Sequence, residues 1–299
     1  MSDGSHFAAA WLALREPVDA RSRAGSLDHA VAAWLATRAA PHGRAVSVLD
    51  LGAGSGSNLR YLAPRLGLAQ QWTLLDQDAG LLAQATRQLP SLPDSLEVST
   101  RCADMRGWCE APEVLDAWLD GVELVTASAL LDLVSQPWVE ALAAAVSRRQ
   151  AAVLIALSVD GDWQLDAADP DHDAASQRAH EDQWMRRHYR AHQATDKGAG
   201  AALGGAAPEA MASALQAHGY RLQMADSPWV LQAPADRALG EALLEGWREA
   251  VSEQVPDAVV EVERWHAARL ASWQRGELII RVGHRDLLAL PDSEGHDHG

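Results

Sequence analysis

The segment that decides the fold is Val46-Ser47-Val48-Leu49-Asp50-Leu51-Gly52-Ala53-Gly54-Ser55-Gly56, a short apolar run that ends in an acid and closely spaced glycines. The run has the length and composition of a buried strand, and Asn58–Leu66 after it has the spacing of a helix. Glycines at a strand-to-helix turn let the backbone turn tightly and approach a ligand, since a Cβ would collide with it. The segment therefore predicts a ligand-binding turn at the end of a strand.

Strand-like and helix-like segments alternate on the C-terminal side of this turn. An alternation of this kind predicts an α/β sheet covered by helices on both faces, with ligands bound beyond the carboxyl ends of the strands. Including the first, the expected strands are Val46–Asp50, Trp72–Asp76, Leu96–Cys102, Leu124–Ala127, Ala151–Ser158, Arg221–Ala225 and Leu278–Val282, the last of which continues through Leu288.

The periodicity also suggests how the chain is divided. We expect a helical N-terminal cover over 1–45, broken at Pro17, and a core over 46–160. Between 161 and 207 the periodicity lapses, which indicates either a substrate-facing insertion or a solvated surface insertion. Residues 208–292 complete the sheet and carry a helical insertion at 236–275, and 293–299 is expected to be a frayed tail.

The composition excludes several classes of protein. The chain has 299 residues, 48% of them hydrophobic, which excludes wholesale disorder. Its formal charge of −16 disfavours nucleic acid as a partner. The longest apolar run, Ala151–Val159, is too short to span a membrane. Cys102 and Cys109 lie in no metal-binding spacing, so we expect a cytoplasmic protein without a metal.

Two cofactor classes use a glycine turn of this kind. A dinucleotide site requires glycine in the pattern G-x-G-x-x-G, but Ser57 stands at the last position. S-adenosylmethionine carries an ammonium, which the carboxylate of Asp50 can help to fix, and a carboxylate, which backbone N–H groups can bind. Asp50–Gly56 resembles motif I, [D/E]-x-G-x-G-x-G, of the class I S-adenosylmethionine-dependent methyltransferases.

The resemblance implies a Rossmann-like, seven-stranded sheet that binds S-adenosylmethionine and releases S-adenosylhomocysteine. It implies that Asp76, with Gln77 beside it, binds the ribose hydroxyls, and that Asp104 and Met105 hold the adenine. Asn58, the only asparagine, either caps the following helix or contacts the cofactor. The complete set of implied cofactor residues is Asp50, Gly52, Ala53, Gly54, Gly56, Asn58, Asp76, Gln77, Asp104, Met105 and Ser128.

The methyl acceptor is harder to read from the sequence. Lys197 is the only lysine of an arginine-rich chain and lies beside Asp196, so it is a candidate for binding an anionic acceptor. His192 is the candidate base, because histidine changes charge near neutral pH. The alternative is a salt-bridged loop. His188 and His192 have a metal-ligand spacing, but no third ligand is evident.

For each of the remaining candidate residues, the sequence allows two interpretations. Trp229 either stacks on substrate or belongs to the core, and Asp132 either contacts the acceptor or caps a helix. The segment Arg15–Pro17 and the pair Arg21 and Arg23 resemble the helical cover of many family members, or form a solvated charged helix.

We therefore expect a methyltransferase acting on a small-molecule acceptor, possibly an anionic one, with no nucleic acid and no membrane as partner. The alternatives are an RNA- or protein-directed methyltransferase and a non-catalytic S-adenosylmethionine-binding regulatory protein. The sequence leaves the acceptor atom and the oligomeric state open.

Overall fold

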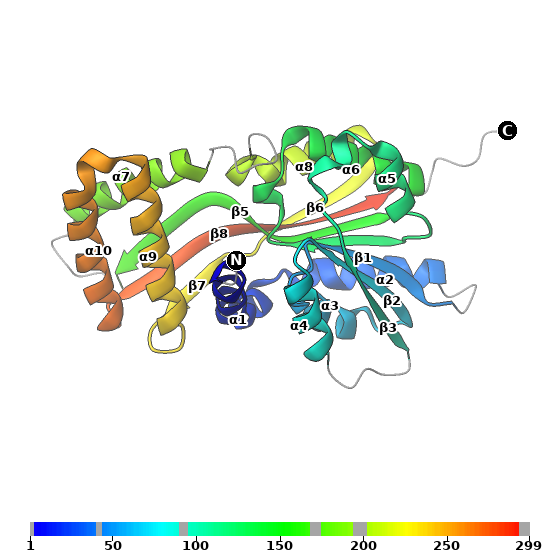
Figure 1. The fold of residues 1–299 in the computed structure, drawn as a ribbon, viewed down its shortest axis with the longest axis horizontal. Helices are drawn as coiled ribbons and strands as arrows, with labels where there is room; N and C mark the ends of the chain where they lie inside the picture. The colour runs from blue at the N-terminus through cyan, green and yellow to red at the C-terminus, as the bar shows by residue number, and fades with distance from the viewer. Residues whose placement is uncertain (1–2, 40–43, 90–94, 168–174, 194–201, 293–299) are drawn as a thin grey trace.

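The computed structural model describes residues 3–39, 44–89, 95–167, 175–193 and 202–292. Within these residues one eight-stranded sheet runs through the molecule in the order β3-β2-β1-β4-β5-β8-β6, and β7 pairs with β8 (Figure 1). The strands are β1 Val46–Leu51, β2 Gln70–Asp76, β3 Leu96–Cys102, β4 Leu124–Ser128, β5 Ala152–Ala167, β6 Tyr220–Asp226, β7 Trp229–Gln232 and β8 Leu278–Pro291.

The expected α/β architecture is confirmed, with parallel pairing from β3 through β5 and antiparallel pairing of β8 with β5, β6 and β7. The strand count differs from the expected seven, because β7 forms beside β8. It escaped the sequence reading because Ser227-Pro228 precedes it and only four residues pair.

Helices cover both faces of the sheet. Helices α5, α6 and α8 bury one face around Leu142 and Met211, and α2, α3 and α4 bury the other around Val31 and Leu62 (Figure 1). The helices are α1 Asp3–Ser22, α2 Gly25–Ala39, α3 Ser57–Leu66, α4 Ala79–Arg87, α5 Pro112–Trp118, α6 Gln136–Arg149, α7 Ala175–Gln193, α8 Ala207–Ala217, α9 Arg237–Gln254 and α10 Val259–Gln274.

Strand β5 is longer than the sequence pattern indicates, at 16 residues, and β8 has 14 residues and ends three residues beyond the expected Leu288. Their pairing continues past register shifts between Ile155 and Ser158 and between Val159 and Trp163. The polar residues Asp160-Gly161-Asp162 lie at the second irregularity, and they interrupted the apolar pattern on which the expected strand end rested. The strand therefore continues into the segment expected to be an insertion.

The extended ends of β5 and β8 carry a second packed region, shown at the left of Figure 1. We call it the tryptophan lobe; it comprises residues 160–167 and 278–283, β7, α7, α9 and α10. Its core contains Trp163 stacked on Trp247, with ring centroids 4.3 Å apart, and also Trp265 and Trp273.

The N-terminal cover differs from expectation at its break. Helix α1 continues through Pro17 to Ser22, and the chain bends at Arg23 and Ala24 before α2 begins. In the part of the chain that the structure describes, no helix has the length and apolarity needed to cross a membrane.

Candidate functional site

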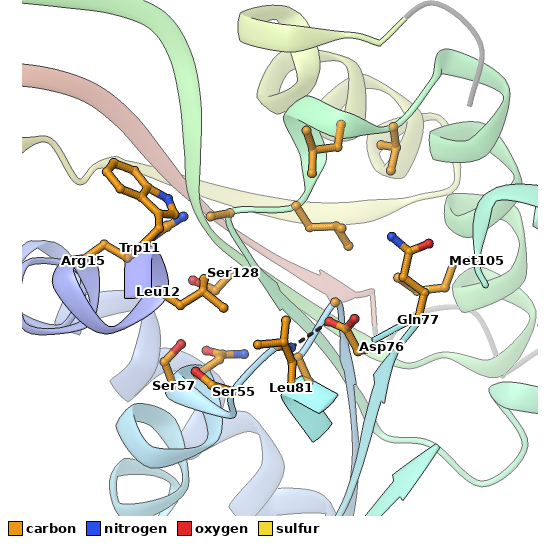
Figure 2. A pocket seen from close by; sticks show the side chains of 18 of the residues that line it. Trp11, Leu12, Arg15, Ser55, Ser57, Asp76, Gln77, Leu81, Met105 and Ser128 are labelled. Atoms are coloured by element: carbon orange, nitrogen blue, oxygen red, sulfur yellow. Dashed lines mark hydrogen bonds between the residues drawn. The ribbon is translucent and has the colours of Figure 1, made fainter. Parts of the chain in front are cut away.

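A cavity of about 430 Å³ lies at the carboxyl ends of β1, β2 and β4, with α1 along one side (Figure 2). Most of the residues expected to bind a cofactor border this cavity. Those that line it are Gly52, Ala53, Gly54, Asn58, Asp76, Gln77, Asp104, Met105 and Ser128. Asp50 and Gly56 belong to the same turn but do not line the cavity.

The glycine turn has the backbone that its sequence indicates. Gly52, Gly54 and Gly56 have φ angles of 63°, 52° and 80°, in the left-handed region that favours glycine. A Cβ at Gly52 would also lie 3.0 Å from the Leu130 side chain. The turn therefore brings backbone N–H groups to the cavity edge at positions where a larger residue would be strained.

Asp76 links the end of β2 to this turn. Its Oδ2 accepts a hydrogen bond from the Gly54 N–H at 2.8 Å, drawn as the dashed line in Figure 2, and its Oδ1 accepts one from the Asp78 N–H at 2.9 Å. Each carboxylate oxygen retains acceptor capacity for a ligand at the cavity edge.

Asp50 is wholly buried beneath the turn. Its Oδ1 accepts a hydrogen bond from the Asn58 Nδ2 at 2.7 Å, whereas its Oδ2 has no hydrogen-bond partner among the described residues. Burial is the main cause that raises the pKa of Asp50 to about 7, against the opposing effects of the Asn58 hydrogen bond and the Arg23 charge.

Asn58 does not have the local capping role left open by the sequence. The residue before the helix is Gly56, which has no side-chain cap, and the Asn58 amide instead bonds to Asp50, Thr126 and Arg23. It is a buried link between strand ends and the N-terminal cover.

Asp104 lies at the opposite side of the cavity and is already paired. The Arg106 Nε lies 3.0 Å and 2.9 Å from the two carboxylate oxygens of Asp104, and these hydrogen bonds lower the pKa of Asp104. The neighbouring Met105 carbonyl accepts a hydrogen bond from the Trp138 indole at 2.9 Å. A ligand at this end of the cavity meets both Arg106 and Trp138, neither of which the sequence singled out.

Helix α1 supplies a wall of the cavity that sequence reasoning missed. Trp11, Arg15 and Asp19 recur every four residues on one helix face and line the cavity with Leu12 (Figure 2 shows Trp11, Leu12 and Arg15). The Arg15 Nε donates to Asp19 Oδ2 at 2.8 Å, so the two charged side chains on this wall form an ion pair. The four-residue spacing of these side chains was the available signal.

Trp229 lies behind this wall. Its indole N–H donates to Asp19 Oδ1 at 3.0 Å, and Arg15 lies over its ring, 5.3 Å from the centroid. The ring is 3% exposed and does not line the cavity. In the structure it supports the two α1 residues that do.

Of the expected acceptor residues, His192 and Asp132 lie in the described part of the chain, and neither lines the cavity. His192 lies on α7 with its Nε2 3.2 Å from Glu253 Oε2 of α9, within the tryptophan lobe. Asp132 lies in the short 3₁₀ helix Leu131–Leu133, where its charge contributes to raising the pKa of Tyr189 to about 12, after the larger effect of burial. Asp196 and Lys197 lie outside the described residues.

A search for metal sites among the described residues finds no group of three or more His, Cys, Asp or Glu side chains able to hold an ion. His188 is beside Trp184, with ring centroids 4.4 Å apart, and burial lowers its pKa.

One family model matches part of the chain. Residues 48–151 match the family model described as a methyltransferase domain. A search of curated proteins finds no match to this sequence.

Several solved structures are similar to most of this chain. A methyltransferase from Geobacter sulfurreducens, S-adenosylmethionine-dependent and in complex with S-adenosyl-L-homocysteine, is 19% identical, with a TM-score of 0.43 over 91% of this chain and 92% of that chain. The cyclopropane synthase MmaA2 from Mycobacterium tuberculosis is 12% identical, with a TM-score of 0.41 over 82% and 78% of the two chains. A phosphoethanolamine N-methyltransferase from Haemonchus contortus is 13% identical, with a TM-score of 0.36 over 87% and 53%.

Proposed function

We propose that the chain transfers the methyl group of S-adenosylmethionine to a small-molecule acceptor, since residues 48–151 match the family model of a methyltransferase domain. The observation that carries the proposal is that one cavity is bordered by the glycine turn, by Asp76 and by the pair Asp104 and Met105. The family resemblance implies that these segments bind the methionine, ribose and adenine parts of the cofactor.

The charges at the site suit a cofactor that carries a sulfonium and an ammonium. Asp50 has a buried carboxylate oxygen without a hydrogen-bond partner among the described residues, and a buried polar atom of this kind is costly unless a ligand or water satisfies it. We propose that Asp50 supports the ammonium, that the N–H groups of the turn bind the carboxylate, and that Ser128 lies beside the methionine chain.

At the other end, Asp76 with Gln77 binds the ribose hydroxyls in this proposal, and Asp104 with Met105 holds the adenine. When bound, the cofactor supplies an electrophilic methyl group on sulfur. The chain contributes alignment and exclusion of water, since much of the cavity wall is apolar, including Trp11, Leu12 and Leu130.

The acceptor enters this proposal as a small molecule because α1 bounds the cavity on one side and the formal charge of −16 disfavours nucleic acid. We further propose that the acceptor is anionic. This part of the proposal is based on Lys197, the only lysine of the sequence, which is next to Asp196. His192 as a base requires a change in its surroundings, because Glu253 is its neighbour in the structure.

The test of cofactor binding is calorimetry with S-adenosylhomocysteine on the wild type and on Asp76→Ala. Loss of a carboxylate that binds two hydroxyls is expected to raise the Kd by about 10- to 100-fold. Asp116→Ala is the control, since it removes the same charge from α5, outside the cavity lining. Absence of binding to the wild type, or equal binding to Asp76→Ala, contradicts the proposal.

Transfer is tested with cofactor labelled on the methyl group and a cell extract divided by size. Label in the small-molecule fraction is expected. Label that enters only RNA or protein contradicts the small-molecule acceptor while leaving the methyltransferase activity in place.

A further inference from the structure

Arg23 occupies the bend between α1 and α2 and is buried despite its charge. Its side chain is 2% exposed, and its guanidinium carbon lies 4.5 Å from the centroid of the Tyr61 ring. Its Nη2 lies 3.5 Å from Asp28 Oδ1 and its Nε lies 3.6 Å from Asp286 Oδ2, so neither nitrogen makes a hydrogen bond with a described residue. The positive charge of Arg23 therefore lies among the carboxylates of Asp28 and Asp286 and the ring of Tyr61.

The remaining contact of Arg23 is shorter and has a different partner. Its Nη1 donates to the Asn58 Oδ1 at 2.9 Å. Because a guanidinium can only donate, Asn58 must turn its oxygen toward Arg23. The amide nitrogen of Asn58 then faces the strand ends, where it donates to Asp50 Oδ1 at 2.7 Å and to Thr126 Oγ1 at 3.1 Å. Arg23 therefore fixes which end of Asn58 meets Asp50.

The charged groups that act on Asp50, directly or through Arg23, come from the α1–α2 bend, α2, β2 and β8. Arg23 at the α1–α2 bend stabilises the ionised form, and Asp76 of β2 disfavours it. Asp28 and Asp286 contact Arg23, and they reduce the net positive charge that acts on Asp50. Asn58 supplies the hydrogen bond to the carboxylate. Arg23 acts on Asp50 in two ways, by its charge and through the orientation of Asn58.

The same bend is attached to the cavity wall. Arg23 is four residues after Asp19, and both border a smaller cavity of about 200 Å³ between α1 and α3, together with Asn58 and Ser128. Asn58, Asp19 and Ser128 also line the larger cavity. The position of α1 and the arrangement beneath the glycine turn are therefore connected through a few buried side chains.

We propose that Arg23 is a positioning residue for the cofactor site, which orients Asn58 and through it holds Asp50 as the carboxylate that supports the cofactor's ammonium. The inference rests on the proposed function. A purely structural Arg23 would serve only to neutralise Asp28 and Asp286. The two roles differ in what the loss of Arg23 does to the pH dependence of ligand binding.

The experiment is calorimetric titration of the whole chain with S-adenosylhomocysteine between pH 5.5 and 8.5. In the wild type, affinity is expected to rise with pH with a midpoint near the Asp50 pKa of about 7, because the negative charge of the ionised carboxylate beneath the turn stabilises the ammonium. In Arg23→Gln the midpoint is expected to move up by about one pH unit, which weakens binding about tenfold on the acid side. The ligand's own titration is common to all variants.

Three further variants sharpen the test. Arg23→Lys keeps the charge and a donor and is expected to restore part of the shift. Arg21→Gln is the control, because Arg21 lies two residues before Arg23, at the end of α1, but pairs with Asp236 at the surface. Asn58→Ala leaves Arg23 and its two ion pairs in place and cuts the contact to Asp50, so it tests the same shift if Arg23→Gln does not fold.

The outcomes separate the inference from the proposed function. A higher midpoint in Arg23→Gln or Asn58→Ala supports the positioning role. An unchanged midpoint in the folded variants, with affinity lowered equally at every pH, overturns it and leaves the cofactor assignment standing. A wild type that fails to bind S-adenosylhomocysteine at any pH removes the proposed function and the inference with it.

Discussion

Individual buried groups in this molecule have pKa values that move in opposite directions. Burial raises the pKa of Asp50 to about 7 and lowers that of His284 to about 4, because in each case the charged form loses its hydration. Asp50 lies at the proposed cofactor site, whereas His284 is on β8 behind the α1 wall, with its ring centroid 4.8 Å from that of Trp229. The lowered pKa of His284 is therefore expected to affect the stability of the fold.

His284 is expected to make the fold sensitive to acid. Its pKa is lower in the folded chain than the ordinary value of 6.5, so the unfolded chain binds more protons between pH 6.5 and about 4, and stability falls as the pH falls through that range. In His284→Gln, the loss of stability between pH 7 and 4 is expected to be smaller by about 3 kcal/mol.

Urea denaturation at several pH values measures this difference. His218→Gln, at an exposed position after α8, is the control and is expected to keep the wild-type pH profile. If His284→Gln loses stability toward acid as steeply as the wild type does, the burial of a neutral imidazole is not a source of acid sensitivity.

The residues that the sequence identified are those whose spacing is fixed locally. Asp50 and the three glycines lie within one strand-to-helix turn, so a pattern of seven residues is sufficient to predict their place. The α1 wall is different: Asp19 meets Trp229 at a separation of 210 residues, and Arg23 meets Asp286 across most of the chain. Such contacts depend on how α1 packs, and no local pattern encodes that.

At the scale of elements, β5 and β8 determine the shape of the molecule. The sequence predicted β8 through Leu288 and the first half of β5, where continuous apolar residues indicate a strand buried on both faces. It missed the continuation of β5 beyond Asp160, because a strand with one packed face and polar residues at a register shift no longer has that pattern. The tryptophan lobe is built on this continuation, and its helices pack there rather than on the core sheet.

Helices α9 and α10 of the lobe pack against each other where Gly240 faces Trp273. A Cβ at Gly240 would lie 2.2 Å from the Trp273 ring, which is wholly buried. Gly240→Ala is therefore expected to force the helices apart and lower the free energy of unfolding by about 1–3 kcal/mol.

Gly246 on the same helix provides the matched control. Nothing lies within 4 Å of a Cβ at that position, and Gly246→Ala is expected to stabilise the fold by up to about 1 kcal/mol through helix propensity. Chemical denaturation followed by circular dichroism compares the two. Equal stability of both variants contradicts close packing between Gly240 and Trp273.

At the scale of the whole molecule, α1 joins the tryptophan lobe to the core across the mouth of the cavity. On the lobe side, Arg21 pairs with Asp236 at 2.7 Å. On the core side, the Arg60 Nε donates to Glu16 Oε1 at 2.7 Å, and Arg23 bonds to Asn58. A ligand in the cavity contacts residues of α1 and of the core turn together, whereas α10 contributes none of the lining.

This arrangement predicts where a bound ligand slows hydrogen exchange. With saturating S-adenosylhomocysteine, amides of 11–23, 52–58 and 76–81 are expected to exchange more slowly, because openings that expose the cavity now require release of the ligand. Amides of α10, Val259–Gln274, are expected to exchange at the unliganded rate. Mass spectrometry of peptides from both states measures the effect. Equal protection of α10 and the glycine turn would mean that the lobe and the core open as one unit, so that α1 does not mark the boundary between them.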